Sequence, residues 1–315
     1  MKILFLYNDE AHAEPLLRAR TYSEHEFIFD EREGYDAILV HQEMMQERYL
    51  SKPVIILERI DGAQLGTSRR WLTKVNGVFK GYTFVDPTLH NKYRGRVFVE
   101  EMQRHLKNYS IPNPVQNLLP AIEFEEKDLA KIHSLYGFGA YSKIQSLRDI
   151  SFDWSAKRRT SVQFAGTVEY RGTAIEIHRR LAAQAANMCR DGVGLCGRVL
   201  NGVDYYKSMI NSKMVLCPYG WGEATHRDYE AMLLGCIVIR PNCVAVDTHP
   251  QIFAPGETFI PCRPDFLDVP QIVKHVCEHY DDYLDWRKRA RQLALDSGDY
   301  EKIAERFDYL IGEVL

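Results

Sequence analysis

The sequence lacks the features that would place it in several large classes of protein. It has no run near the roughly 18 apolar residues of a membrane-spanning helix. It has no G-x-x-x-x-G-K-[ST] phosphate loop, and no H-E-x-x-H or C-x-x-C pair that would indicate a metal or redox site. Its net charge of −3 gives no general attraction to nucleic acid or to anionic membranes. These absences argue against a membrane-spanning protein, a P-loop nucleotidase, a zinc or redox protein with a standard motif, and a general nucleic-acid binder. They leave an ordinary globular protein.

Length and composition predict two domains in a reducing compartment. A chain of 315 residues exceeds a comfortable single core, and its apolar and charged fractions, 45% and 26%, are those of a soluble globular protein. The first residues, MKILFLYNDE, are too short in their apolar run for a signal peptide and are typical of a strand. All seven cysteines lie from Cys189 onward, several within apolar runs, as Cys217 and Cys236 are. Buried free thiols of this kind indicate a cytoplasmic protein.

Short apolar runs alternate with helical patterns in both halves, which predicts an α/β fold. We expect an N-terminal domain over 1–150 and a C-terminal domain over 159–315, joined by an irregular, proline-containing linker at about 108–158. The expected strands cover 2–7, 37–41, 53–58 and 77–82, then 160–165, 192–196, 214–217, 236–239 and 259–261. The expected helices cover 68–75, 126–135, 173–188, 204–211, 226–234, 269–280, 283–296 and 301–315.

The stretch 213–241, KMVLCPYGWGEATHRDYEAMLLGCIVIRP, is the most informative part of the chain. It predicts a strand, a glycine-containing loop, a helix ended by Gly235 and a second strand, which together form a βαβ unit. Thr225 is suited to the N-cap, with Asp228 as the capping-box acid. Arg227 falls in the first turn, where the helix dipole disfavours a cation unless an anion is also bound.

Glu230 lies three residues after Arg227, so the two side chains share one face of the predicted helix. A cation for a phosphate beside a carboxylate for ribose hydroxyls outlines a nucleoside-diphosphate site. The alternative is a surface Arg–Glu pair. A second segment, FAGTVEYRG, places Gly166 after a strand and Arg171 before a helix, where phosphates also bind. Its alternative is an ordinary βα loop with a solvated arginine.

The run YYKSMINSKMVLCPYGWGEATHRDYEAMLLGCIVI resembles the C-terminal nucleotide-sugar-binding segment of exostosin-type glycosyltransferases. FAGTVEYRG is similar to the same family's F-x-G strand end followed by an RG pair, and the likeness extends over about 160–242. The E-x7-E signature of related glycosyltransferases is incomplete, because Gly222 stands where its first glutamate would fall and Glu223 is one place late. The positions that match the exostosin spacing are Tyr206, Ser212, Pro218, Gly220, Arg227, Glu230, Ala231, Gly235 and Cys236.

The resemblance implies a GT-B fold, in which two Rossmann-like domains with parallel sheets face each other across a cleft. It implies transfer of a sugar, with UDP-sugar the expected donor, in glycan biosynthesis. Glu230 would hold the ribose hydroxyls, and Arg227 and Arg171 would neutralise the departing diphosphate. Gly166, Tyr219 and Gly220 would complete the donor site, with Tyr219 and Trp221 as aromatic residues for stacking on a base or sugar. No D-x-D pair occurs, so we expect arginines in place of a divalent metal.

The acceptor side is less defined by the sequence. The likeness to exostosins favours inversion, which needs a general base, whereas the wider likeness to retaining families leaves that outcome open. Candidate bases lie in loops after expected strands: Asp61, Asp9 and His12 foremost, with Glu10 and Glu43 as further choices. We expect a carbohydrate or other hydroxyl acceptor and no nucleic acid. The basic stretch WRKRARQ is typical of a solvated face, with peripheral membrane contact as its other interpretation.

The sequence therefore predicts a cytoplasmic, metal-independent glycosyltransferase of GT-B architecture. Two alternatives stay open at this point. One is a nucleotide-sugar-binding protein that keeps the fold without catalysis. The other is a GT-B-like sugar-nucleotide epimerase.

Overall fold

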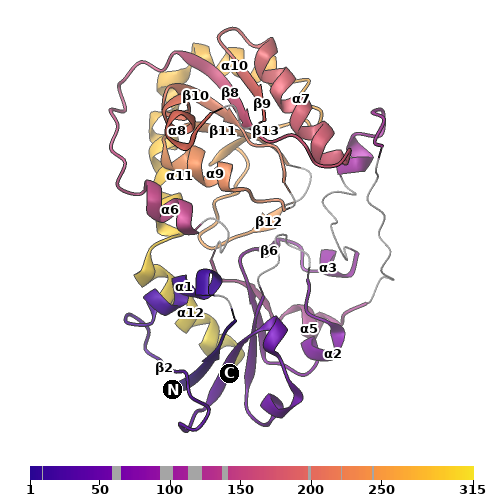
Figure 1. The fold of residues 1–315 in the computed structure, drawn as a ribbon, viewed down its shortest axis with the longest axis vertical. Helices are drawn as coiled ribbons and strands as arrows, with labels where there is room; N and C mark the ends of the chain where they lie inside the picture. Colours follow the sequence, from indigo (N-terminus) through magenta and orange to yellow (C-terminus); the bar gives the residue numbers. More distant parts are fainter. Residues whose placement is uncertain are drawn as a thin grey trace.

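Two parallel β-sheets, one in each half of the molecule, organise the fold (Figure 1). The computed structural model describes residues 1–8, 10–58, 65–92, 102–112, 123–136, 141–197, 200–220, 222–242 and 245–315. Helices cover both faces of each sheet, which is how parallel sheets bury their apolar strands. The expected fold class, two Rossmann-like α/β halves with parallel sheets as in GT-B proteins, is confirmed by this topology.

The N-terminal sheet has the strand order β2-β1-β3-β4-β5-β7. Alternate residues of β1 point to opposite faces, as strand geometry requires. Ile3 and Phe5 pack with α1 and α12, whereas Leu4 packs with the short helices of the other face. The described elements of this half are β1 (Lys2–Leu6), α1 (Glu10–Ala19), β2 (Glu26–Ile28), β3 (Ala37–His41), 3-10 turns at Gln42–Met44 and Glu47–Ser51, β4 (Val54–Glu58), α2 (Arg69–Leu72), β5 (Gly77–Lys80), β6 (Thr83–Phe84), α3 (Leu89–Lys92), α5 (Glu126–Leu129) and β7 (Ile132–Ser134).

The C-terminal sheet has the order β13-β11-β10-β8-β9. One face carries α9 and α11 and the other carries α7 and α10. The described elements are α6 (Tyr141–Leu147), β8 (Thr160–Gly166), α7 (Ala174–Met188), β9 (Val193–Cys196), α8 (Gly202–Ile210), β10 (Ser212–Leu216), α9 (His226–Leu233), β11 (Ile237–Pro241), β12 (Val246–Asp247), β13 (Phe259–Cys262), α10 (Val269–Glu278), a 3-10 turn at Tyr280–Tyr283, α11 (Leu284–Asp296) and α12 (Tyr300–Val314).

Both sheets follow one topological scheme. Numbered within its own sheet, the C-terminal sheet has the order 2-1-3-4-5, and the N-terminal sheet has the same order with a sixth strand, β7, beside the fifth. In both, the strand order reverses between the first and third strands. Ligands of doubly wound folds bind outside the carboxyl ends of the strands at such a reversal. The reversal lies between β1 and β3 in the N-terminal sheet and between β8 and β10 in the C-terminal sheet. The topology therefore marks one favoured ligand position in each half.

The stretch expected to be an irregular linker contains regular structure. The helix expected over 126–135 ends at Leu129, and Ile132–Ser134 forms β7, which pairs in parallel with β5. The expectation of one long helix was wrong because the exposed edge of β5 offers hydrogen bonds that the local pattern does not reveal. Helix α6 also falls in this stretch, and its Ile144 and Leu147 are part of the core beside α9.

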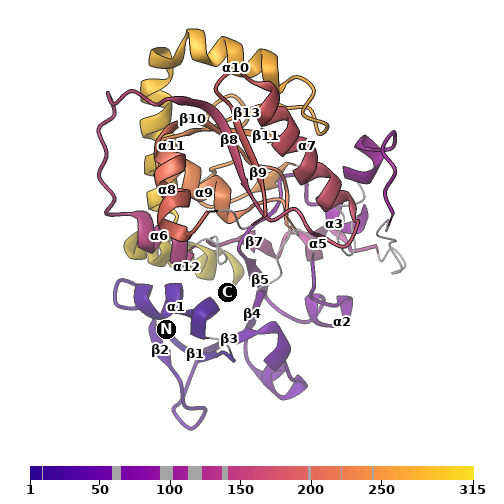
Figure 2. The same ribbon diagram turned by 45° about the horizontal axis from the view of Figure 1, so that its top comes forward.

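The two halves are joined by more than a linker. Helix α12 belongs to the C-terminal half by sequence, yet it lies beside α1 and places Phe307 and Leu310 in the N-terminal core (Figures 1 and 2). Strands β6 and β12 form a two-stranded antiparallel sheet between the halves. Next to it, the Ser134 hydroxyl donates to Asp247 Oδ2 at 2.6 Å.

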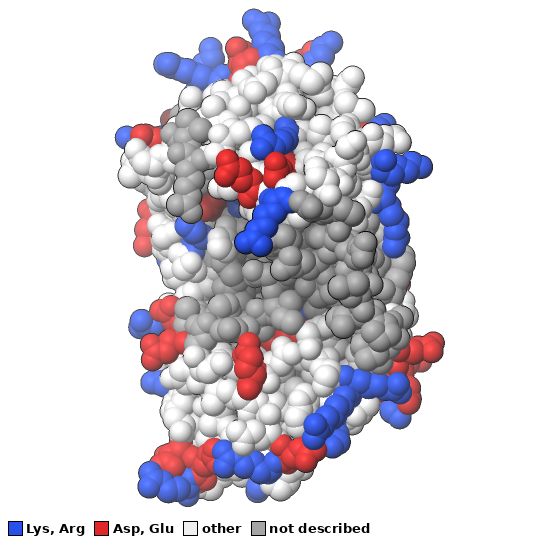
Figure 3. Space-filling view, turned by 45° about the vertical axis from the view of Figure 1, so that its right-hand side comes forward, with Lys and Arg blue, Asp and Glu red and all other residues white. Residues whose placement is uncertain are grey.

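The charged surface agrees with the small net charge. On the described part of the face in Figure 3, acidic and basic side chains are interspersed rather than gathered by sign. No helix within the described ranges is both long enough and apolar enough to cross a bilayer. Of the expected buried thiols, Cys217 and Cys236 are each 1% exposed.

Candidate functional site

A hollow of about 460 Å³ lies at the carboxyl end of the C-terminal sheet. It is lined by Gly166 at the end of β8, Gly197 after β9 and the first turns of α9 from Thr225 to Glu230. Because β8 borders the reversal of strand order in this sheet, the hollow occupies its favoured ligand position. Its volume is within the range of small-ligand sites, about 300–1,000 Å³.

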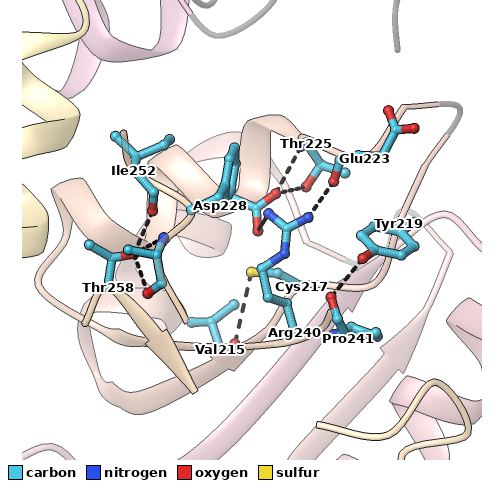
Figure 4. Close-up of polar contacts among 12 residues, drawn as sticks. Val215, Cys217, Tyr219, Glu223, Thr225, Asp228, Arg240, Pro241, Ile252 and Thr258 are labelled. Atoms are coloured by element: carbon cyan, nitrogen blue, oxygen red, sulfur yellow. Dashed lines mark hydrogen bonds and ion pairs between the residues drawn. The ribbon is translucent and has the colours of Figure 1, made fainter. Parts of the chain in front are cut away.

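Helix α9 is held firmly at its N-terminus. Its first residue is His226, and the N-cap is Thr225, as the sequence predicts. Asp228 Oδ2 accepts hydrogen bonds from the amide and the hydroxyl of Thr225, at 2.8 and 2.9 Å (Figure 4). Asp228 Oδ1 accepts from Arg240 of β11 at 3.2 Å, so one carboxylate joins the helix start to the sheet. This anchoring fixes where the positive end of the helix dipole points.

The C-terminus of α9 is equally well satisfied. Gly235 has φ +67°, and the amides of Gly235 and Cys236 donate to Met232 and Ala231, which is the Schellman arrangement that ends a helix. A Cβ at Gly235 would lie 2.8 Å from the Phe152 ring. Three arginines cap the last carbonyls: Arg291 donates to Leu233, Arg158 to Leu234 and Arg287 to Gly235.

Arg227 provides a buried cation beside the hollow. Its side chain is 9% exposed, lies over the Phe164 ring at 4.7 Å, and donates through Nη2 to the Ala165 carbonyl at 2.8 Å. Within the described residues its Nε and Nη1 have no hydrogen-bond partner of normal geometry, and the Tyr205 phenol is a weaker polar contact of the same guanidinium. A buried guanidinium with unused donors is costly unless a ligand accepts from it. The arrangement therefore suits an anion.

Arg179 of α7 is a second buried cation at the same hollow, and the sequence patterns do not indicate it. It donates through Nε to the Tyr219 carbonyl at 3.2 Å and through Nη1 to the Thr167 carbonyl at 2.9 Å. Burial and the nearby Arg227 lower the pKa of Arg179 to about 10. Two buried cations that repel each other gain stability when an anion binds between them.

Glu230 also lines the hollow, one turn into α9. It is 5% exposed and accepts from the phenols of Tyr205, at 2.9 Å, and Tyr206, at 3.1 Å. Lys143 of α6 approaches to 3.9 Å. The hollow thus has a cationic end near Arg227 and an acceptor end near Glu230. The surface Arg–Glu pair considered from sequence is wrong, because both side chains are buried.

Gly166 permits the closest approach in the site. A Cβ built on it would lie 2.2 Å from Arg227 Nη2, far inside contact distance. We therefore expect Gly166→Ala to displace the guanidinium and to weaken anion binding by about tenfold or more, since hydrogen bonds to charged groups contribute about 1.5–3 kcal/mol each. Titration calorimetry with a nucleoside diphosphate measures the effect.

The matched control is Gly312→Ala in α12, where a Cβ meets nothing within 4 Å. That variant is expected to bind like wild type and to be slightly more stable, because alanine favours a helix over glycine. Unchanged binding by Gly166→Ala would show that Arg227 has room to move without loss.

The other donor-side residues predicted from sequence have different places. Arg171 is exposed at a turn with φ +56° and is not among the residues lining the hollow. Tyr219 is fully buried, and its hydroxyl donates to Pro241 at 2.7 Å (Figure 4). Gly220 is buried behind Arg179, whose Nη2 would lie 3.2 Å from an added Cβ. Gly166, Arg227 and Glu230 are brought together at the hollow, whereas Trp221 lies outside the described residues.

The acceptor-side candidates belong to the N-terminal half of the sequence. Asp9 and Asp61 lie outside the described residues; His12 is in α1, its side chain not described. Asp9 and His12 follow β1, which borders the reversal of strand order. At that position Asn8 Oδ1 lies 2.9 Å from Nδ1 of the buried His41, which ends β3. These three candidates therefore stay predictions.

Gly192, Gly194 and Gly197, in and next to β9, have the spacing G-x-G-x-x-G but a different role from a dinucleotide loop. A Cβ at Gly192 or Gly194 would lie about 2 Å from the α7 carbonyls of Ala186 and Ala183, so both allow close packing of strand and helix. Only Gly197, with φ +96°, lies past the strand and lines the hollow. Among the residues with described placement, no three His, Cys, Asp or Glu side chains form a group able to hold a metal.

Comparison with known proteins gives likenesses of fold only. No family model and no curated protein matches the sequence, so the exostosin resemblance depends on the spacings described above. The solved structures that match include Anabaena HepE in complex with UDP-glucose, at 12% identity and TM-score 0.46 over 99% of this chain and 100% of that one. An α-glucosyltransferase, AGT, in complex with UDP matches at 10% identity and TM-score 0.47, over 98% of this chain and 99% of that one. S. aureus MnaA with UDP matches at 12% identity and TM-score 0.45, over 99% of this chain and 96% of that one.

Proposed function

We propose that this protein is a glycosyltransferase that takes its sugar from a nucleoside-diphosphate sugar, with UDP-sugar as the donor. The observation that carries the proposal is the pair of buried arginines, Arg227 and Arg179, at the N-terminus of α9. A carboxylate, Glu230, lies one turn further along the same hollow. Diphosphate and ribose are the two parts of a nucleotide that these groups suit, because phosphates bind arginines and helix N-termini and ribose hydroxyls donate to carboxylates.

The reaction follows from the charge of the leaving group. An acceptor hydroxyl oxygen forms a bond to C1 of the sugar while the bond from C1 to the β-phosphate oxygen breaks. Negative charge then grows on the diphosphate, where Arg227 and Arg179 are already oriented by the Ala165, Thr167 and Tyr219 carbonyls. Preorganised cations of this kind stabilise such a transition state without rearrangement. They supply the positive charge that a divalent ion supplies in other enzymes.

The acceptor in this proposal is a carbohydrate or another compound with a free hydroxyl. In the inverting form of the reaction its proton passes to a base of the N-terminal half, with Asp61, Asp9 and His12 as the candidates. The exostosin-like spacings support this form. The proposal places the donor on the C-terminal half and the acceptor on the N-terminal half.

A panel of UDP, GDP, dTDP and CMP nucleotides and sugars, tested by thermal unfolding, decides the donor. We expect UDP and UDP-sugars to stabilise the wild type most. A ligand at a hundred times its Kd adds about 2.7 kcal/mol to the free energy of unfolding, which is a shift of several degrees. Glu230→Ala should reduce the shift, because it removes the carboxylate acceptor from the hollow.

Absence of stabilisation by every nucleotide would contradict the proposal. If a nucleotide does stabilise the protein, turnover of the corresponding sugar donor is measured with and without EDTA, and the two rates are expected to be equal. Binding with neither hydrolysis nor transfer would indicate a nucleotide-binding protein without catalysis, and an altered sugar on the recovered donor would indicate an epimerase.

A further inference from the structure

Two adjacent tyrosines of α8 hold the carboxylate of Glu230 from different positions. The Tyr205 hydroxyl donates to Oε2 and the Tyr206 hydroxyl donates to Oε1, so each carboxylate oxygen receives one phenol. The two rings lie 5.3 Å apart between centroids with a tilt of 59°. Tyr205 lines the hollow, whereas Tyr206 is not among its lining residues. Tyr206 therefore holds Glu230 from outside the space that a ligand would enter.

A lysine from a distant part of the chain extends this contact. Lys143 of α6 donates to the Tyr206 hydroxyl at 3.5 Å and lies 3.9 Å from Glu230 Oε1. The chain of contacts thus runs from Lys143 through Tyr206 to one oxygen of the carboxylate. Burial raises the pKa of Tyr206, so its phenol remains a donor at any ordinary pH.

The phenols leave acceptor capacity on the carboxylate. An ionised carboxylate has about four lone-pair sites on its two oxygens, and the phenols use one on each. One site per oxygen remains for two donors that are fixed side by side. The 2′- and 3′-hydroxyls of a ribose form such a pair, whereas a 2′-deoxyribose offers only one of them.

We propose that Tyr206 is a positioning residue that fixes the rotation of the Glu230 carboxylate and thereby makes the site select ribonucleoside over 2′-deoxyribonucleoside diphosphates. The inference rests on the proposed function, because it concerns the sugar of the bound nucleotide. Without the Tyr206 hydroxyl, Oε1 is held by Lys143 alone, at a longer distance. The carboxylate then rotates, and its oxygen is no longer oriented to accept a hydrogen bond from the second ribose hydroxyl.

The test compares Kd values for UDP and 2′-deoxy-UDP, and for GDP and 2′-deoxy-GDP, by titration calorimetry. The wild type is expected to prefer the ribonucleotide by at least about tenfold, the effect of one hydrogen bond to a charged group. Tyr206→Phe is expected to reduce that preference by about threefold or more. Affinity for the deoxynucleotide, which depends on Arg227 and Arg179, should be nearly unchanged.

Tyr22→Phe is the matched control, because this tyrosine is 57% exposed in the N-terminal half. It should keep the wild-type ratio. Lys143→Met should lower the preference less than Tyr206→Phe, because the lysine lies 3.9 Å from Oε1 whereas the Tyr206 hydroxyl donates to it at 3.1 Å. A damaged fold would weaken both nucleotides of a pair equally, and circular dichroism checks the fold directly.

The outcomes separate this inference from the proposed function. If wild type binds a nucleoside diphosphate but Tyr206→Phe keeps its ribose preference, the positioning role is overturned and the proposed function stands. An equal affinity of the wild type for both sugars overturns the inference in the same way. If no nucleotide binds to the wild type, the proposed function fails as well.

Discussion

Replacing Arg227 with methionine is expected to lower nucleoside-diphosphate affinity by about a hundredfold or more without lowering the free energy of unfolding. Arg227 is only 9% exposed, and its Nε and Nη1 have no hydrogen-bond partner of normal geometry among the described residues. Replacing a buried, poorly compensated charge by an apolar residue of similar size is often neutral or stabilising. Relief of repulsion with Arg179 acts in the same direction. The loss of binding reflects two or more hydrogen bonds to an anion, each about 1.5–3 kcal/mol.

Titration calorimetry and urea unfolding measure the two effects on one preparation. Arg180→Met is the matched control, because Arg180 is exposed on α7 and pairs with Glu176 at 3.0 Å. It should change neither the affinity nor the free energy of unfolding appreciably.

Arg171→Met decides whether the arginine indicated by the exostosin likeness takes part in binding the diphosphate. Unchanged affinity would leave Arg227 and Arg179 as the cations of the site. Parallel loss of binding and stability in Arg227→Met would indicate a structural role.

Replacing Asp228 with alanine is expected to reduce the free energy of unfolding by about 3–5 kcal/mol. The Asp228 carboxylate and Arg240 form a buried ion pair at 3.2 Å, with side chains 1% and 3% exposed. Removing one member leaves the other buried without its countercharge, which is the costly case. Arg240 would keep its hydrogen bond to the Glu223 carbonyl at 2.6 Å (Figure 4). It would also keep its contacts with the aromatic rings of Tyr219, Phe253 and Phe259. The cap of α9 is lost with the same substitution.

Chemical denaturation measures the change, and Glu257→Ala is the control. Glu257 pairs with Arg289 at the surface, where both side chains are more than half exposed, so its removal should have little effect. Nucleotide affinity should also fall in Asp228→Ala, because the first turn of α9 is no longer anchored to β11. A variant as stable as wild type would mean that Arg240 finds another partner.

Sequence reasoning was most successful where structure is determined locally. The helix from His226, its cap at Thr225, its end at Gly235 and the flanking strands all follow from neighbouring residues, and all are present. Burial of Cys217 and Cys236 follows from the same apolar runs. Sequence reasoning failed at β7, where strand formation depends on the edge of a strand about fifty residues away. The last helix is assigned to the C-terminal domain by its place in the sequence, whereas Phe307 and Leu310 of α12 pack in the N-terminal core, a long-range contact that no local pattern indicates.

The sequence by itself determined the βαβ unit around α9 and the presence of Arg227 and Glu230 on one face, because helical periodicity and capping act over a few residues. Only the tertiary structure decided which other groups join them. Arg179, Tyr205 and Lys143 come from three different helices, and no spacing in the chain indicates that they meet. Arg179 and Tyr205 meet because the parallel sheet brings the ends of β8 and β9 to one edge, and α7 and α8, which follow those strands, converge there. Lys143 joins them because α6, which precedes β8 in the chain, packs against α9.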